Sequence, residues 1–248
     1  MRTLAAELLK LRTTRVPLVL GLVVVLITGI AAAALVGSGS LDTDRALALA
    51  QGSTLALMFA TVLGILLVTN EYRHGTIMTT FLVEPGRARV LLAKLAAALL
   101  AGSAYGLVAI VTVVAVAMPW LALRGEPLAL DGQALEALGR LVLAFALSAA
   151  LGAAAGAIIQ SQVGTIVAVL VWFLIVESLI GLVAALVFGS LGEPDPVSPY
   201  LPGTTLGGIV GGQGSEYMLR GGPAAMLATA YVAGLSALGA LAIVRRDP

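Results

Sequence analysis

The sequence predicts an all-α integral membrane protein with six transmembrane helices. Of its 248 residues, 60% are hydrophobic and only 11% are charged, whereas roughly a quarter of the residues in soluble domains are charged. The hydrophobic residues form long uncharged runs, and a hydrocarbon core about 30 Å thick needs about 20 helical residues to cross it. Composition and run length together therefore exclude an ordinary soluble domain.

Four transmembrane helices follow directly from these runs, at residues 16–37, 46–69, 92–120 and 222–244. A fifth uncharged run, Leu141 to Val176, would form a helix about 54 Å long, which is too long for one crossing. Its only polar cluster is Gln160-Ser161-Gln162. We therefore expect a turn there, with helices at 138–159 and 163–187 and a single transmembrane domain over 1–248.

The distribution of basic residues predicts that both termini are cytoplasmic, because Lys and Arg accumulate in cytoplasmic loops. With the N-terminus inside, the inner segments hold Arg2, Lys10, Arg12, Arg15, Arg73, Arg87, Arg89, Lys94, Arg245 and Arg246, and the outer ones hold four Arg. A five-helix topology would place Arg245 and Arg246 outside. The excess of Arg over Lys and the abundance of Ala and Gly are typical of a bacterial protein, so we expect a multi-pass protein of the bacterial plasma membrane.

An amphipathic helix is predicted at residues 2–14. Leu4, Leu8 and Leu11 recur at helical spacing, while charged residues occupy the other faces, as in helices that lie in the membrane interface. Two interpretations stay open for it, a membrane anchor or an elbow helix that also touches a cytoplasmic partner. A cleaved signal peptide is disfavoured, because the following apolar run is longer than a signal core.

A polar segment, residues 70–86, separates the second and third transmembrane helices and ends at Pro85-Gly86, where a helix is disfavoured. One face is apolar and another is polar, which predicts a short helix along the membrane surface. The apolar face holds Ile77, Met78, Phe81 and Leu82, and the polar face holds Arg73, Thr76 and Thr80.

The string Glu71-Tyr-Arg-His-Gly-Thr76, followed by Pro85, Arg89 and Lys94, resembles the signature of type-2 ATP-binding-cassette (ABC) exporter permeases. The resemblance implies that 70–86 is a coupling helix seated on a separate ATPase subunit. The residues at or near that contact would be Glu71, Arg73, His74, Gly75 and Thr76. It also implies a homodimer of permeases with two ATPase subunits, exporting a hydrophobic or amphipathic compound such as a drug, peptide or lipid. Without it, a solvated basic loop that binds anionic lipid explains the segment.

The chain itself offers no machinery for ATP hydrolysis or metal catalysis. A phosphate-binding loop requires Gly-Lys followed by Ser or Thr, yet Lys10 and Lys94 are both followed by Leu. ATP and Mg²⁺ would thus bind the partner subunit, and we expect no cofactor on this chain. With no Cys, a single His74 and no zinc-protease motif, neither catalytic nor metal-ligating residues are expected. Nothing indicates nucleic-acid binding. A secondary carrier and a non-transporting scaffold that docks a cytoplasmic partner remain alternatives.

Inside the predicted membrane region, Glu177 is the notable ionisable residue. Such a residue either stabilises packing or lines a substrate path, and Arg140 would be its partner if the fourth and fifth helices formed an antiparallel hairpin.

The connection 190–221 is too apolar for a solvated loop and too short to cross the membrane, which predicts an outer re-entrant element. Small residues at four-residue spacing, Ser148-Gly152-Gly156 and Gly102-Gly106, predict close helix contacts, within one subunit or between two.

Overall fold

The computed structural model describes residues 2–38, 45–84, 86–125, 131–191, 195–211 and 219–245. Over these residues the secondary structure is helical, without any strand. Six helical segments are long and apolar enough to cross a membrane, namely Val16–Ser38, Arg45–Arg73, Arg87–Leu123, Gly132–Ile159, Gln162–Leu191 and Gly222–Ile243. The predicted all-α architecture with six such helices is therefore confirmed, and these helices indicate a multi-pass membrane protein.

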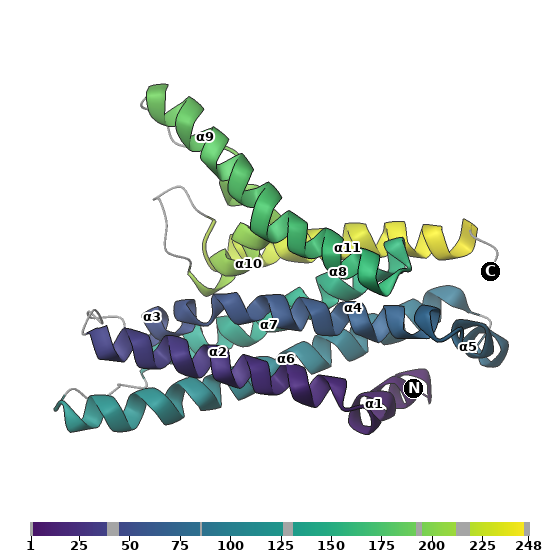
Figure 1. The fold of residues 1–248 in the computed structure, drawn as a ribbon, viewed down its shortest axis with the longest axis horizontal. Coiled ribbons are helices and arrows are strands. Elements are labelled where there is room, and N and C mark those ends of the chain that lie inside the picture. Colours follow the sequence, from purple (N-terminus) through teal and green to yellow (C-terminus); the bar gives the residue numbers. More distant parts are fainter. Residues whose placement is uncertain are drawn as a thin grey trace.

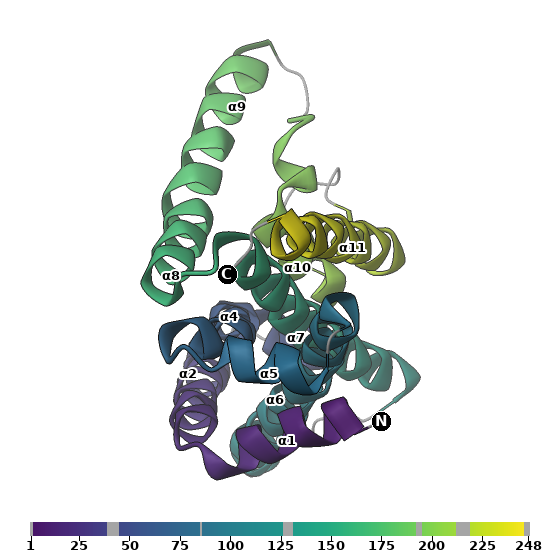
Figure 2. The ribbon, with the colours of Figure 1, turned by 90° about the vertical axis from the view of Figure 1, so that its right-hand side faces the viewer.

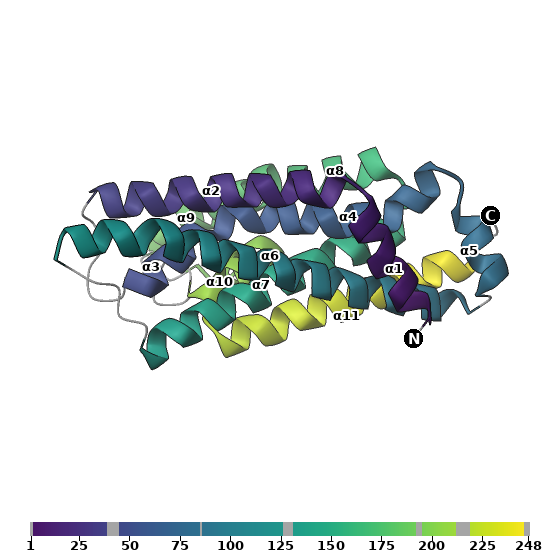
Figure 3. The same ribbon diagram turned by 90° about the horizontal axis from the view of Figure 1, so that it is seen from below.

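The first half of the chain forms α1 (Arg2–Thr13), α2 (Val16–Ser38), α3 (Arg45–Gly52), η1 (Thr54–Ala56), α4 (Leu57–Arg73), α5 (Ile77–Val83) and α6 (Arg87–Leu123). The short helix α1 crosses the ends of the long helices at a steep angle (Figure 3). The second membrane segment consists of α3, η1 and α4, so its helical path is interrupted near Ser53. Pro85, part of the family-like string, lies outside the described residues.

The second half forms α7 (Gly132–Ile159), α8 (Gln162–Val171), η2 (Trp172–Val176), α9 (Glu177–Leu191), η3 (Ser198–Tyr200), α10 (Pro202–Val210) and α11 (Gly222–Arg245). The element η2 is a single turn of π-helix that joins α8 to α9 without a break. Between α7 and α8, Gln160 adopts a left-handed conformation with φ of 59°. Ser161 then accepts a hydrogen bond from the Gly164 amide as the N-cap of α8. The chain thus turns where the sequence predicts it.

Helix α7 lies at the centre of the bundle and packs against α4, α6 and α11 (Figures 1 and 2). In the most apolar 18-residue stretch of Gly132–Ile159, 72% of the residues are buried. In the corresponding stretch of Gln162–Leu191, 6% are buried. Alanine dominates the buried positions of α7. Small side chains allow helices to approach closely, which strengthens van der Waals packing where water provides no driving force.

The small residues make contacts within this one chain. A methyl group placed on Gly152 of α7 would lie 2.0 Å from the Thr61 carbonyl oxygen of α4. On α6, the corresponding positions of Gly102 and Gly106 meet the backbone of α7 at 2.5 Å and 2.7 Å. Both sets of small residues, Ser148-Gly152-Gly156 and Gly102-Gly106, therefore belong to contacts between α7 and its neighbours. Of the two interpretations that the sequence left open, the contacts lie within one subunit.

The start of α1 and the end of α11 lie at the same end of the bundle (Figure 3). We call this the α1 end; it also contains the α4–α5 connection and the start of α6. Arg87 at the start of α6 donates a hydrogen bond to the Ile243 carbonyl of α11 at 2.8 Å. Arg246, used in the topology argument, lies outside the described residues.

The fifth membrane segment leaves the bundle as it runs away from the α1 end. Helix α8 contacts α4 and α7, whereas α9 extends outward with mainly η2 and η3 beside it (Figures 1 and 2). Its surface is apolar and exposed, with Leu179, Leu182 and Leu186 each more than half exposed. Such a surface suits contact with hydrocarbon.

The connection after α9 contains the short helix α10, which packs against α7, α11 and η3. Its side chains Leu206, Ile209 and Val210 are buried in the main core. After the helix, the Gly221 amide donates a hydrogen bond to the Gly208 carbonyl at 3.0 Å. Residues 192–194 and 212–218 of the predicted re-entrant connection lie outside the described residues.

Candidate functional site

The α4–α5 corner, residues 71–76, is a helix end followed directly by a second helix. The Thr76 amide donates to the Glu71 carbonyl at 3.0 Å and the Gly75 amide donates to the Tyr72 carbonyl at 3.4 Å. Together with Gly75 at φ of 66°, these bonds form a Schellman motif, in which glycine adopts the left-handed conformation at low cost. The corner is therefore a defined turn that ends α4 and redirects the chain into α5.

Four of the five predicted contact residues are exposed at this corner, namely Arg73, His74, Gly75 and Thr76. Arg73 donates a hydrogen bond to the Gln162 side chain at the start of α8, at 3.0 Å. His74 Nδ1 lies 2.8 Å from the Asn70 carbonyl oxygen. Because a carbonyl only accepts, Nδ1 carries a proton in this pair, and in the neutral ring Nε2 is then the acceptor.

Glu71, the fifth predicted contact residue, faces the protein interior and is only 7% exposed. Its carboxylate lies 2.5 Å from Lys10 Nζ of α1 and 3.0 Å from Lys94 Nζ of α6. Glu71, predicted to lie at or near the partner contact, therefore has its side chain turned away from the exposed surface of the corner. Its side chain holds the end of α4 to two other elements instead.

A second carboxylate, Glu7 of α1, completes a four-residue charge cluster with Lys10, Glu71 and Lys94. Glu7 lies 2.9 Å from Lys10 Nζ and 3.1 Å from Lys94 Nζ, so each lysine contacts both acids. Two positive and two negative charges leave the cluster neutral. A buried ion pair is tolerated only when both partners are satisfied in this way, because desolvation of each charge is costly.

Lys94 is the most enclosed member of the charge cluster. Its side chain is 2% exposed, and its ammonium also donates to the Leu67 carbonyl at 3.3 Å. Lys10 is half exposed. Burial disfavours its ammonium, but hydrogen bonds with Glu71 and Glu7 outweigh that effect and raise the pKa of Lys10 above its usual value. The cluster therefore joins α1, α4 and α6 at the α1 end.

Two charged residues inside predicted helices could have indicated this cluster from the sequence, but they were counted only as evidence for the topology. Lys94 lies in the third predicted helix, 92–120, beyond the basic residues that mark the loop before it. Counting it as another loop cation conceals that a charge inside an apolar helix needs a partner. Glu7 interrupts the amphipathic helix 2–14 in the same way, and the two residues are 87 positions apart.

Glu177 occupies a different site, beside the N-terminus of α10. Its carboxylate accepts hydrogen bonds from the Gly203 amide at 2.8 Å, the Thr204 amide at 3.3 Å and Trp172 Nε1 at 2.7 Å. The first amides of a helix lack partners within it, and Leu201 at the N-cap position has no side-chain acceptor. Glu177 thus caps α10 from another helix.

The predicted pairing of Glu177 with Arg140 is wrong. Arg140 forms an ion pair with Glu136 on its own helix, and its guanidinium lies against Gly221 at the start of α11. The prediction assumed that the fourth and fifth segments form a close hairpin. Since α9 leaves the bundle (Figure 1), Glu177 finds its partners in α10 and η2 instead.

We expect Glu177→Ala to lower the free energy of unfolding by about 2 kcal/mol, because it leaves two amides and an indole N–H without their acceptor. Glu177→Gln should lose less, since its amide oxygen still accepts. Thermal unfolding of the purified variants measures both. Equal stability of the two variants and the parent would contradict the capping role, and lost transport in a stable Gln variant would assign the residue to a substrate path.

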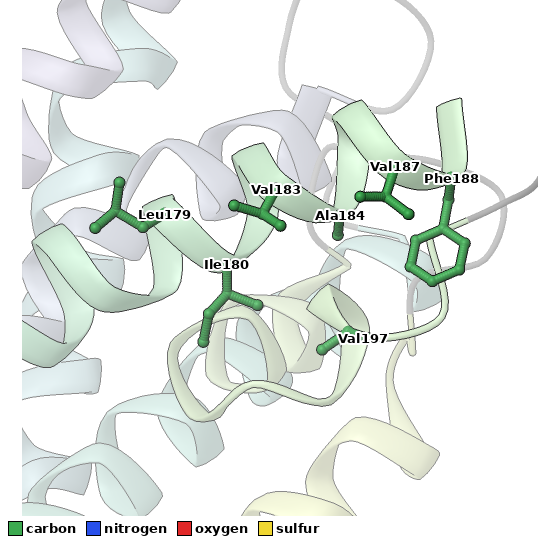
Figure 4. A pocket seen from close by; sticks show the side chains of 7 residues that line it. All are labelled: Leu179, Ile180, Val183, Ala184, Val187, Phe188 and Val197. Carbon is green, nitrogen blue, oxygen red and sulfur yellow. The ribbon is translucent and has the colours of Figure 1, made fainter. Parts of the chain in front are cut away.

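No protein-family model matches the chain, and no curated protein matches it either. Over the described residues, no group of three or more His, Cys, Asp or Glu side chains could hold a metal ion. A hollow of about 320 Å³ beside α9 is lined only by apolar side chains (Figure 4). These are Leu179, Ile180, Val183, Ala184, Val187, Phe188 and Val197.

Proposed function

We propose that the chain is the membrane permease subunit of an ATP-driven ABC exporter and docks a separate cytoplasmic ATPase through the α4–α5 corner. The observation that supports this best is the contrast within the corner. Arg73, His74, Gly75 and Thr76 are exposed, while Glu71 on the preceding turn is held in the buried charge cluster. When a partner binds to an exposed surface and moves it, a firmly anchored helix end can pass that movement on to the rest of the bundle.

The α1 end is then the cytoplasmic end, in agreement with the basic residues concentrated in its segments. ATP and Mg²⁺ bind the ATPase subunits, of which two pair with a permease homodimer. Movement of the corner reaches α1 and α6 through Glu71, and it reaches α7 through the close α4–α7 packing. A hydrophobic or amphipathic cargo suits the apolar composition.

The function is tested first by whether a gene next to that of this chain encodes an ABC ATPase, and then by co-expressing the chain with that ATPase. We expect a complex whose ATPase activity responds to the permease, and Gly75→Ala should weaken that response several-fold. A residue with a Cβ costs about 1–2 kcal/mol in the left-handed conformation, so the corner changes shape. Among the described residues, no atom lies within 4 Å of the position that the added methyl would take, so a steric clash would not explain the result.

Gly125→Ala is the matched control. Gly125 also has a left-handed conformation, with φ of 74° and no atom of a described residue within 4 Å of an added methyl, but follows the end of α6 that is remote from the α1 end. It should lose similar stability and keep full coupling. Equal coupling in both variants would overturn the docking assignment.

Two other outcomes would assign the chain to a different class. A chain that binds no ATPase and drives transport with an ion gradient would be a secondary carrier, and one that binds the ATPase without any turnover would be a scaffold.

A further inference from the structure

A hollow of about 550 Å³ lies at the α1 end between α1, the start of α2 and the last turns of α4. Its volume is within the range of sites that bind small molecules, about 300–1,000 Å³. Polar and apolar side chains both line it. The polar ones include Lys10, Asn70, Glu71 and His74, and the apolar ones include Leu11, Pro17, Leu63, Leu66 and Leu67.

These two kinds of side chain are separated by depth along α4. Leu63 precedes Asn70 by seven residues, which corresponds to about 10 Å along the helix axis. The polar groups therefore lie at the end of the bundle, where lipid headgroups are expected, and the leucines of α4 lie toward the hydrocarbon. A molecule that fills the hollow needs the same order of polarity, a polar end followed by an apolar chain.

Three polar groups at the rim have bonding capacity left. Lys10 Nζ uses two of its three donors on Glu7 and Glu71. In the neutral ring of His74, whose Nδ1–H faces the Asn70 carbonyl, Nε2 is a hydrogen-bond acceptor. For the side-chain amide of Asn70, no hydrogen bond occurs to any residue that the structure describes. The rim thus offers donors for a phosphate and an acceptor for an N–H group.

The charge at the rim favours a headgroup without net charge. Lys10 and Lys94 are balanced by Glu7 and Glu71, so an anion alone would add an uncompensated negative charge. A zwitterion brings its own positive group. An ammonium with N–H donors can bond to His74 Nε2 while the phosphate accepts from Lys10 and Asn70.

We propose that this hollow binds one phospholipid with a phosphoethanolamine headgroup, its phosphate at Lys10 and Asn70 and one acyl chain along Leu63, Leu66 and Leu67. The bound lipid would hold α1 against α4 at the hollow, where the charge cluster does not join the two helices. The inference does not depend on the proposed exporter function, because it uses only the polarity and charge of the hollow.

Native mass spectrometry of the full-length protein, delipidated in detergent, tests the proposal. Phosphatidylethanolamine, phosphatidylcholine and phosphatidylglycerol with identical acyl chains are titrated separately. We expect one tightly bound phosphatidylethanolamine, held roughly tenfold more tightly than the other two lipids. Equal affinity for phosphatidylcholine, which has no headgroup N–H, or tighter binding of phosphatidylglycerol would overturn the headgroup assignment.

Two variants locate the site. Leu67→Trp fills the hollow and should abolish the tight binding event, whereas Leu92→Trp should preserve it. Leu92 is 64% exposed near the start of α6 and does not line the hollow, so it is a matched control. His74→Phe, on an exposed side chain, should weaken phosphatidylethanolamine binding about tenfold without disturbing the fold. Unchanged binding in His74→Phe, or equal binding by the two tryptophan variants, would refute the proposed site.

Discussion

Lys94→Met is expected to lower the free energy of unfolding by about 3–5 kcal/mol, the cost of removing one partner from a buried ion pair. Methionine matches the lysine side chain as far as Cε but lacks the ammonium, so Glu7 and Glu71 face each other with only Lys10 between them. Because Lys94 is 2% exposed, water cannot replace its ammonium. Unfolding of the detergent-purified variant by heat or by titration with sodium dodecyl sulfate measures the loss.

Lys10→Met is the control for Lys94→Met. It removes a lysine that contacts the same two carboxylates, but its side chain is half exposed, so solvent screens the loss. It should cost clearly less. Adding Glu71→Gln to Lys94→Met should restore part of the stability, since one unpaired carboxylate disappears. If Lys94→Met costs no more than Lys10→Met, the cluster does not anchor the corner.

The sequence predicted the membrane segments because their signal is local. Run length and hydropathy are sufficient to find six helices, and the polar triplet at Gln160-Ser161-Gln162 marks the turn within the longest run. The arrangement of the helices was not predictable in the same way. Segments 138–159 and 163–187 have similar hydropathy, yet one lies at the centre of the bundle and the other at its edge. What separates them is the alanine-rich surface of α7, which allows neighbours to approach on several sides.

The candidate site was predicted in part. The break in hydropathy at residues 70–86 marked the exposed corner, because it is a local feature. The role of Glu71 was missed, since its partner Lys10 lies 61 residues away in sequence. The Arg140–Glu177 pairing failed for a related reason: adjacency in the chain was taken for adjacency in space, while the α8–η2–α9 segment diverges from α7 (Figure 2).

Gly152→Ala should destabilise the protein by about 3 kcal/mol or more, at the upper limit of the usual cost of overpacking. The added methyl would lie 2.0 Å from the Thr61 carbonyl oxygen, and the reciprocal position on Gly64 lies 1.8 Å from the Ala149 carbonyl. Backbone atoms on both sides cannot rotate away as a side chain would, so α4 and α7 must separate. The thermal midpoint of the purified variant measures the effect.

Gly139→Ala on the same helix provides the comparison, because nothing lies within 4 Å of its added methyl. Alanine is favoured over glycine in a helix by about 1 kcal/mol, so this variant should be as stable as the parent or slightly more stable. Similar midpoints for the two variants would mean that α4 and α7 approach less closely than the structure indicates. A large difference would confirm that α4 and α7 pack as closely as the structure shows, and this contact joins the end of α4, held by Glu71, to the centre of the bundle.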